Sequence, residues 1–229
     1  METLRTKLSD RLQMVASFVN KGDVIADIGT DHAYLPAYLI SNKICPKAIA
    51  SDIGTGPLKN AEKIVFRANL HQHIKLMISD GLEKYSPDDA DVFIFAGMGG
   101  TLIVKLLKNI DWIKNNEKRF IFQPMSHSED VISFLINNGF EIEEEKSCFD
   151  SGRCYVAFSA RYTQTSKKYD ECFPYIGLLP NNSDESSKHF ISKQYNHLKK
   201  RADALNCANI NLSEQKEIRK ILSQIENYL

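Results

Sequence analysis

The chain has 229 residues, enough for one sizeable hydrophobic core and a smaller appendage. Lys and Arg together number 29, as do Asp and Glu, so the net charge is zero and gives no overall attraction to nucleic acid or to an anionic membrane. No apolar run reaches the roughly 20 residues of a membrane span, and the charged amino terminus lacks the apolar centre of a signal peptide. We therefore expect a protein of the cytoplasm that has no membrane partner.

The thiols and imidazoles give no indication of a metal. The five cysteines are scattered and form no Cys-x-x-Cys pair, which favours reduced thiols over a disulfide framework or a zinc site. His71, His73, His189 and His197 also lack the spacing of metal ligands. We expect no metal centre.

Predicted helices and strands alternate through the first two thirds of the chain. Apolar residues at helical spacing indicate an opening amphipathic helix, and they are Leu4, Leu8, Leu12, Val15 and Val19. Short β-branched runs predict strands at residues 24–28, 47–52, 74–79, 91–96 and 119–123, the last of them ended by Pro124. Helices are predicted at residues 36–42, 58–69, from 101 onward and at 128–138. This alternation predicts an α/β fold with a parallel sheet.

The pattern changes in the last third of the chain. Residues 140–148 and 154–162 are predicted strands joined directly by residues 149–153, so they form an antiparallel hairpin at the end of the sheet. After a polar connector, apolar residues again recur at helical spacing in two segments, Ile191, Tyr195, Leu198, Ala202 and Leu205, and then Ile218, Leu222, Ile225 and Leu229. We predict a main domain at residues 1–163 and an antiparallel, coiled-coil-like helical hairpin at residues 164–229.

A mostly parallel sheet that ends in an antiparallel hairpin resembles the Rossmann-like fold of the class I S-adenosylmethionine-dependent methyltransferases. An ordinary dinucleotide-binding fold would end in another parallel unit instead. The resemblance implies S-adenosylmethionine as the cofactor and S-adenosylhomocysteine as its product.

The turn after the first predicted strand carries acids in place of phosphate-binding glycines. A dinucleotide fingerprint needs Gly-x-Gly-x-x-Gly so that backbone amides can approach a pyrophosphate. Here only Gly29 is present, Asp31 occupies the second glycine position, and Asp27 precedes the turn. These carboxylates would repel a pyrophosphate, whereas a cofactor with a sulfonium and an ammonium group suits them.

Two further acids follow the next strands, where ligands of open α/β sheets bind. Asp52 is placed to accept hydrogen bonds from ribose hydroxyls, and Asp80, followed by Gly81, is placed for an adenine amino group. The alternative is that such acids only cap helices and turns. The cofactor-binding candidates are Asp27, Gly29, Thr30, His32, Asp52, Ile53, Asn60, Asp80, Gly81 and Gly97. For His32, a local hydrogen bond within the loop is equally consistent with the sequence. For Asn60, an exposed position on its helix is equally consistent.

The sequence also resembles one family within this class. Residues 27–36 (Asp-Ile-Gly-Thr-Asp-His-Ala-Tyr-Leu-Pro), the Gly97-Met98-Gly99-Gly100 segment, Gln123-Pro124 and the helical hairpin are together similar to the bacterial TrmK-type tRNA methyltransferases. The resemblance covers essentially the whole chain. It implies methylation of N1 of adenine 22 in tRNA, with tRNA as the partner and no obligatory protein partner.

Asp31 is the candidate catalytic residue. N1 of adenine has an in-plane lone pair, so it can attack the methyl group without prior deprotonation, and the product ring is cationic. A fixed carboxylate stabilises this developing charge more than it stabilises the ground state. We expect Asp31 to do so, or to orient the base by accepting from its amino group.

The substrate-binding candidates are Tyr34, Met98, Gly99, Gln123, Lys199, Lys200 and Arg201. The target base must leave its stack, so Tyr34 and Met98 are predicted to offer it a surface, Gly99 to leave space and Gln123 to contact its edge. The sequence is equally consistent with structural roles for two of these residues, Tyr34 as a core aromatic and Gln123 as a turn residue. Lys167-Lys168, Lys199-Lys200-Arg201, Arg5 and Arg11 are the candidates for phosphate contacts, or are solvated helix faces.

Two other functions remain open on the sequence alone. One is a methyltransferase for another RNA or a small molecule, with the helical hairpin as a lid or dimer contact. The other is a non-catalytic RNA-binding protein on a methyltransferase scaffold.

Overall fold

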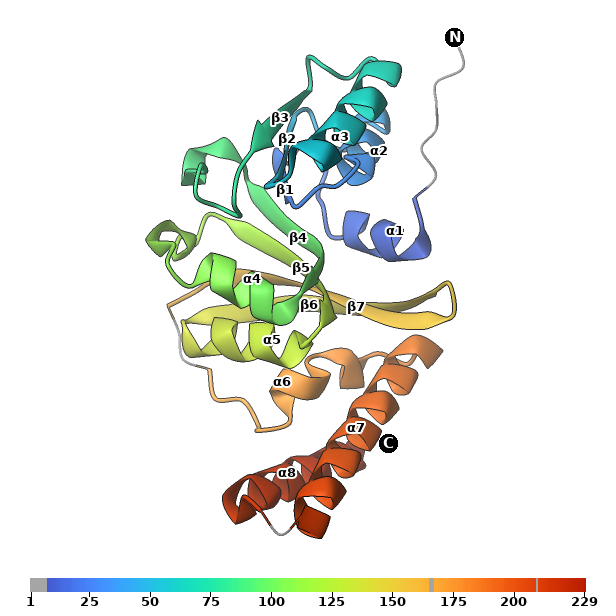
Figure 1. The fold of residues 1–229 in the computed structure, drawn as a ribbon, viewed down its shortest axis with the longest axis vertical. Helices are drawn as coiled ribbons and strands as arrows, with labels where there is room; N and C mark the ends of the chain where they lie inside the picture. The colour runs from blue at the N-terminus through green and yellow to red at the C-terminus, as the bar shows by residue number, and fades with distance from the viewer. Residues whose placement is uncertain (1–7, 165–166, 209) are drawn as a thin grey trace.

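The computed structural model describes residues 8–164, 167–208 and 210–229, and its centre is a seven-stranded sheet in the order β3-β2-β1-β4-β5-β7-β6 (Figure 1). β1 through β5 pair in parallel, and β7 is antiparallel to both β5 and β6. The strands are β1 (Ile25–Ile28), β2 (Ala48–Asp52), β3 (Ile74–Ile78), β4 (Val92–Gly99), β5 (Arg119–Ser126), β6 (Phe140–Asp150) and β7 (Arg153–Tyr162). The predicted α/β fold with a terminal hairpin is confirmed.

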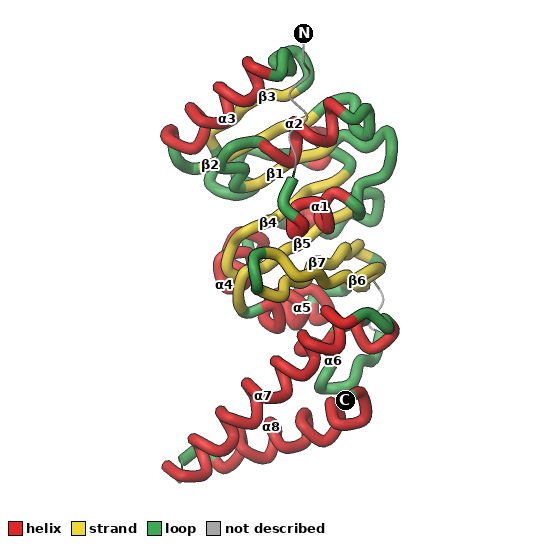
Figure 2. Tube along the Cα trace, turned by 90° about the vertical axis from the view of Figure 1, so that its right-hand side faces the viewer, coloured by secondary structure: helices red, strands yellow, loops and turns green. Residues whose placement is uncertain are grey.

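Helices cover both faces of the sheet (Figure 2). The first hydrophobic cluster joins α1, α2 and α3 to one face, and the second joins α4 and α5 to the other. The helices are α1 (Asp10–Ala16), α2 (Tyr34–Ser41), α3 (Thr55–Arg67), α4 (Gly100–Leu107), α5 (Ser128–Asn137), α6 (Phe173–Ile176), α7 (Glu185–Ala208) and α8 (Leu212–Ile225), with short 3-10 helices η1 (Pro87–Asp89), η2 (Asp111–Ile113), η3 (Leu179–Asn181) and η4 (Glu226–Tyr228). Leu4 and Arg5 of the predicted opening helix lie outside the described residues.

Aromatic side chains fill the centre of the sheet beneath its carboxyl edge. Phe93 and Phe95 of β4 are fully buried, because β4 is covered on both faces and can be apolar throughout. Phe95 stacks on Phe122 of β5 with ring centroids 5.4 Å apart, and Phe93 stacks on Phe120 at 5.7 Å. Each such pair contributes about 0.5–1.5 kcal/mol beyond simple burial. The two strands therefore form a rigid base for whatever their carboxyl ends hold.

Two strands run further than the sequence predicts. β4 continues past Ala96 to Gly99, and β5 continues past Gln123 to Ser126, with Met98 opposite Pro124 and irregular register on either side. The prediction that Pro124 ends β5 is wrong. Proline is tolerated here because β7 pairs with β5 only as far as Phe122, so the missing N–H removes no bond on that side.

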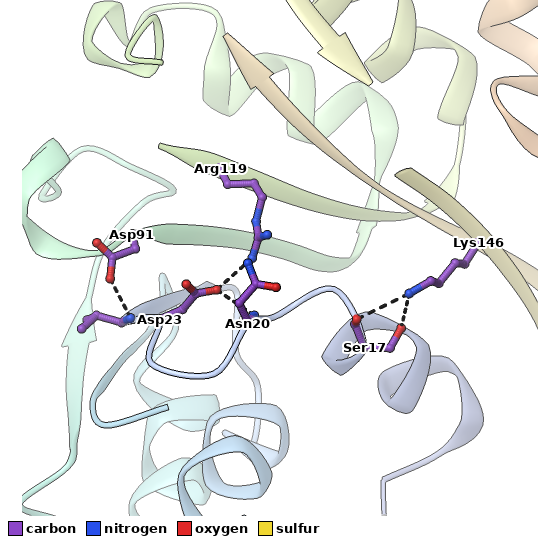
Figure 3. A network of polar contacts seen from close by, with 7 residues as sticks. Ser17, Asn20, Asp23, Asp91, Arg119 and Lys146 are labelled. Atoms are coloured by element: carbon purple, nitrogen blue, oxygen red, sulfur yellow. Dashed lines mark hydrogen bonds and ion pairs between the residues drawn. The ribbon is translucent and has the colours of Figure 1, made fainter. Parts of the chain in front are cut away.

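Polar contacts join the segments before β1 and after α1 to strands of the sheet (Figure 3). Asp23, just before β1, accepts hydrogen bonds from the backbone N–H of Asn20 and from Arg119 Nη2 at the start of β5, both at 2.8 Å. The Lys146 ammonium on β6 donates to the hydroxyl and the carbonyl oxygens of Ser17, just after α1. These contacts tie the segment before β1 to β5, and the end of α1 to β6.

The last two long helices form an antiparallel hairpin whose core is shared with the sheet (Figure 1). Phe190 and Ile191 of α7 and Ile218 of α8 belong to one buried cluster with Cys154 and Val156 of β7. The predicted helical hairpin is confirmed. Because β7 completes this core, the helices are held against the sheet by burial and not only by the connector.

Two carboxylates secure the connection between the sheet and the helical hairpin. Asp184 precedes α7 and accepts from the hydroxyls of Ser186 and Ser187; burial alone would raise its pKa, but these bonds lower it to about 2. Glu145 of β6 is buried and accepts from the backbone N–H of Leu178 at 2.6 Å. Burial raises the pKa of Glu145 to about 8, against the opposing effect of this bond. The joint is therefore sensitive to ionisation of Glu145.

Within the described part of the chain, no helix combines the length and apolar character needed to cross a bilayer.

Candidate active site

The turn after β1 is built around a buried carboxylate. Asp27 is only 5% exposed and accepts a 2.5 Å hydrogen bond from the hydroxyl of Thr30. The backbone N–H groups of Gly29 and Thr30 both donate to the carbonyl of Ser51 at 2.8 Å, which ties the turn to β2. Burial raises the pKa of Asp27 to about 6; the Thr30 bond lowers it and the charge of Asp52 raises it further. A cation bound here would further favour the ionised form of Asp27.

Gly29 suits the backbone conformation of this turn and lies against the end of β4. Its φ is +76°, a conformation that strains other residues, and an added Cβ would overlap the methyl group of Met98. The turn of β1 and the glycine-rich end of β4 are thus in van der Waals contact, so they form one site.

Asp31 projects away from the protein at this edge. Its φ of +48° and that of Ala33, +55°, are left-handed, which costs on the order of 1–3 kcal/mol for each such residue. The Asp31 side chain is 68% exposed, and its carboxylate lies 3.3 Å from His32 Nε2. His32 in turn stacks on Tyr34 at 5.2 Å between ring centroids. Tyr34 is 39% exposed, so its interpretation as a core aromatic is wrong.

Asp52 and Asp80 stand at the carboxyl ends of the neighbouring strands. Asp52 ends β2 and accepts from the backbone N–H of Gly54 at 2.8 Å, while Asp80 follows β3 and is exposed. The Ser79 backbone N–H donates to the Asp52 carbonyl, which holds the two ends together. With Asp27 on β1, the acids occupy three adjacent strands. This edge is therefore anionic and suits a cationic ligand.

The other cofactor-binding candidates surround these acids. Gly81 has a φ of +52°, and an added Cβ would lie 2.6 Å from Leu106 Cδ2, so close packing also demands glycine there. Ile53 is 67% exposed beside Asp52, and Asn60 is half-buried on α3. Their contacts with a cofactor remain predictions.

The glycines at the end of β4 have two different roles. Gly97 is exposed, with a φ of +84°, and leaves the mouth of the site open. Gly100 is buried, and an added Cβ would overlap the carbonyl of His127, so this glycine serves close packing at the start of α4. Gly99 lies between them, its Cβ position 3.4 Å from Ser126 Oγ.

Arg11 reaches this mouth from α1, which the sequence does not reveal. Its Nη1 donates to Gln123 Oε1 at 2.5 Å and lies 3.6 Å from the Cβ position of Gly97. The guanidinium also packs over the ring of Tyr155. Gln123 is fully buried within β5, so its interpretation as a turn residue is wrong. A contact of Gln123 with a base remains a prediction, and it requires Arg11 to release the Gln123 side-chain oxygen.

The three basic residues on α7 do not act as one cluster. Arg201 forms an ion pair with Glu214 of α8, and the Lys199 ammonium lies 5.9 Å from the ring centroid of Tyr195. Lys200 instead lines a groove against β7. In the described ranges, no group of His, Cys, Asp and Glu residues is arranged to hold a metal ion.

The strand order, the anionic edge and the open mouth at β4 define a Rossmann-like methyltransferase. Residues 8–158 match the family described as a methyltransferase domain. The chain is 35% identical to the tRNA (adenine(22)-N(1))-methyltransferase of Bacillus subtilis over 189 residues, which are 82% of this chain and 79% of that protein. By this identity and coverage, the chain belongs to the family of the tRNA (adenine(22)-N(1))-methyltransferases.

Two solved structures share the whole architecture. Streptococcus pneumoniae Sp1610 in complex with S-adenosyl-L-methionine is 29% identical, with a TM-score of 0.78 and coverage of 97% of this chain and 100% of that one. TrmK of M. capricolum in complex with S-adenosyl-homocysteine is 27% identical, with a TM-score of 0.79 and coverage of 97% and 99%. The similarity therefore includes the helical hairpin as well as the sheet.

Proposed function

We propose that this protein transfers the methyl group of S-adenosylmethionine to N1 of adenine 22 in tRNA. The observation that carries the proposal is Asp31, an exposed carboxylate with a left-handed backbone in the turn whose Gly29 packs against Met98 at the end of β4. Family membership supplies the substrate and the position of the base.

The residues at the carboxyl edge of the sheet fit the cofactor. S-adenosylmethionine, when bound, supplies a methyl group activated by a positively charged sulfonium. Asp27 would favour the cationic part, Asp52 would accept from the ribose hydroxyls, and Asp80 with Gly81 would receive the adenine. Thr30 fixes the Asp27 carboxylate through its hydroxyl, and Gly29 and Met98 would border the methyl donor.

The remaining chemistry rests on the acceptor base. As the N1–carbon bond forms, the carbon–sulfur bond breaks and its electron pair stays on sulfur, so positive charge passes to the adenine ring. The Asp31 carboxylate stabilises this charge, or accepts from the exocyclic amino group and thereby aligns N1. No general base is needed, because N1 of adenine carries no proton.

The base also needs a surface outside the tRNA fold. Tyr34 and His32 present stacked, partly exposed rings next to Asp31, which suits a flipped base. Alignment of donor and acceptor in this space supplies a large part of the rate.

The proposal also gives the two parts of the chain different binding roles. Residues 1–163 hold the cofactor and the base, and residues 164–229 contact the tRNA.

The experiment is a methyl-transfer assay on transcribed tRNA with wild-type protein, Asp31→Ala and the matched control Asp88→Ala. Asp88 is an exposed acid of η1, away from the site. Loss of one group that stabilises transition-state charge costs on the order of 10²–10³-fold in kcat. We expect this loss for Asp31→Ala, unchanged activity for Asp88→Ala, and similar cofactor affinity for all three. Wild-type turnover by Asp31→Ala would refute the role of Asp31.

A further inference from the structure

A groove of about 960 Å³ lies between the sheet and α7, outside the anionic edge. Its walls are residues 124–129, residues 152–156 at the tip of the β6–β7 hairpin, and one face of α7. Figure 1 shows the hairpin tip between α1 and the beginning of α7. We propose that this groove binds the sugar–phosphate backbone of the substrate tRNA. The inference rests on the proposed function and specifies where the RNA lies.

One stripe of α7 supplies the first wall. His189, Lys193, His197 and Lys200 line the groove and are all exposed. Their spacing of four, four and three residues places them on a single helix face. The opposite face of α7 is buried in the core that it shares with α8 and β7. The polar stripe is therefore left outside that core, where it lines the groove.

The second wall adds a cation and little opposing charge. Arg153 is exposed at the hairpin tip. Among the described residues that line the groove, Glu129 is the single acid, and its carboxylate lies 3.5 Å from His127 Nδ1. Arg153, Lys193 and Lys200 form no ion pair with any described residue. Three cations without an ion-pair partner among the described residues thus line one groove.

Some basic residues elsewhere on the helical hairpin already have partners. Arg201 pairs with Glu214, Lys220 pairs with Glu171, and Lys199 lies over Tyr195. Lys188, Lys216 and Arg219 are exposed without an ion pair to any described residue but lie outside the groove. What distinguishes the groove is that it brings three unpaired cations together in one concave site, although the whole chain carries no net charge.

The groove lies next to the mouth of the active site. Tyr155 is part of its wall and carries the guanidinium of Arg11, which lies next to Gly97. Ser126 also lines the groove and approaches Gly99. An RNA strand held along α7 would therefore lead its target nucleotide toward Asp31. The cations along this path favour a polyanion as the occupant.

The experiment measures tRNA affinity by fluorescence anisotropy over a range of salt concentrations. The test variant is Arg153→Ala/Lys193→Ala/Lys200→Ala. The matched control removes the same charge from exposed basic residues outside the groove, as Lys188→Ala/Lys216→Ala/Arg219→Ala. Each lost phosphate contact lowers the slope of log K against log salt by about 0.7–0.9. We expect the groove variant to lose about 2–3 units of slope and roughly tenfold to a hundredfold in affinity near 0.1 M salt.

The control variant should lose less than one unit of slope, and both should bind S-adenosylmethionine like wild type. Methylation by the groove variant should show a raised KM for tRNA with kcat retained. Equal losses in both variants, or none in the groove variant, would overturn the proposal. So would displacement of labelled tRNA by polyglutamate as effectively as by unlabelled tRNA, since it would indicate an acidic protein partner.

The two proposals fail separately. If wild type methylates adenine 22 and the groove variant binds tRNA normally, only the groove assignment is wrong. If wild type binds tRNA through the groove but leaves adenine 22 unmodified, only the reaction is wrong.

Discussion

Asp27 couples the stability of the cofactor turn to its affinity for a cation, and Asp27→Asn separates the two. The carboxylate is buried and its pKa is raised from 3.8 to about 6. The folded protein therefore holds this proton more tightly than the unfolded chain does. Stability from this group is fully present below about pH 4 and is lost as the pH rises toward 6.

The size of the effect follows from the shift. Two pKa units correspond to about 3 kcal/mol, which is the order of magnitude by which ionised Asp27 destabilises the cofactor-free fold above pH 6. An asparagine keeps an acceptor for the Thr30 hydroxyl and carries no charge. Asp27→Asn should therefore be more stable than wild type at pH 8, and its stability should change less between pH 4 and 6.

The same substitution that increases stability should decrease the affinity for the cofactor. With a pKa near 6, about nine tenths of Asp27 is ionised at pH 7 and about one tenth at pH 5. We expect wild-type affinity for S-adenosylmethionine to fall about tenfold over this range, and Asp27→Asn to bind weakly throughout. Titration calorimetry at several pH values measures the affinity, and denaturant unfolding measures the stability. A wild-type pH profile that persists in Asp27→Asn would refute the reasoning.

Three further variants test other parts of the site and its support. Gly29→Ala places an alanine at a positive φ against the Met98 methyl group, so unfolding experiments should show a loss of about 1–3 kcal/mol in stability, together with lost cofactor binding. The control is Gly56→Ala in α3, where the new methyl group meets open space, and it should be neutral or stabilising. Wild-type stability should fall as the pH rises from about 4.5 to 8, and Glu145→Gln should remove this fall. Thermal unfolding at both ends of that range measures the effect, and an unchanged pH dependence would contradict the assigned pKa of Glu145. Arg11→Ala should weaken methylation without changing cofactor affinity in a calorimeter, and equal loss of both would mean that Arg11 acts only by holding the fold.

The features that the sequence predicts are those set by local pattern. The first strand, predicted at residues 24–28, is Ile25–Ile28, and the hairpin predicted from residue 140 begins there. The ends of β4 and β5 depend on each other instead. Gly97 and Pro124 disfavour strands locally, yet these segments pair because each has the other as a neighbour.

In the candidate site, too, some features follow from local sequence and others depend on residues that are distant in the chain. Acids placed after successive strands must meet at one edge when the strands are parallel neighbours, so the gathering of Asp27, Asp52 and Asp80 was predictable. The bond between Arg11 and Gln123 joins residues 112 positions apart and leaves no local signal. The Lys199–Arg201 run looked like one cluster in sequence, but successive helical residues point in different directions, so only Lys200 lines the groove.

The most direct test of the account is the location of the transferred methyl group. Wild-type protein is incubated with S-adenosylmethionine and a transcribed tRNA, and the modified nucleotide is identified by mass spectrometry and by the stop it causes in reverse transcription. The account predicts 1-methyladenine at position 22, and no incorporation into the same tRNA carrying guanine there. Methylation at another position, or incorporation that survives the substitution, would contradict it.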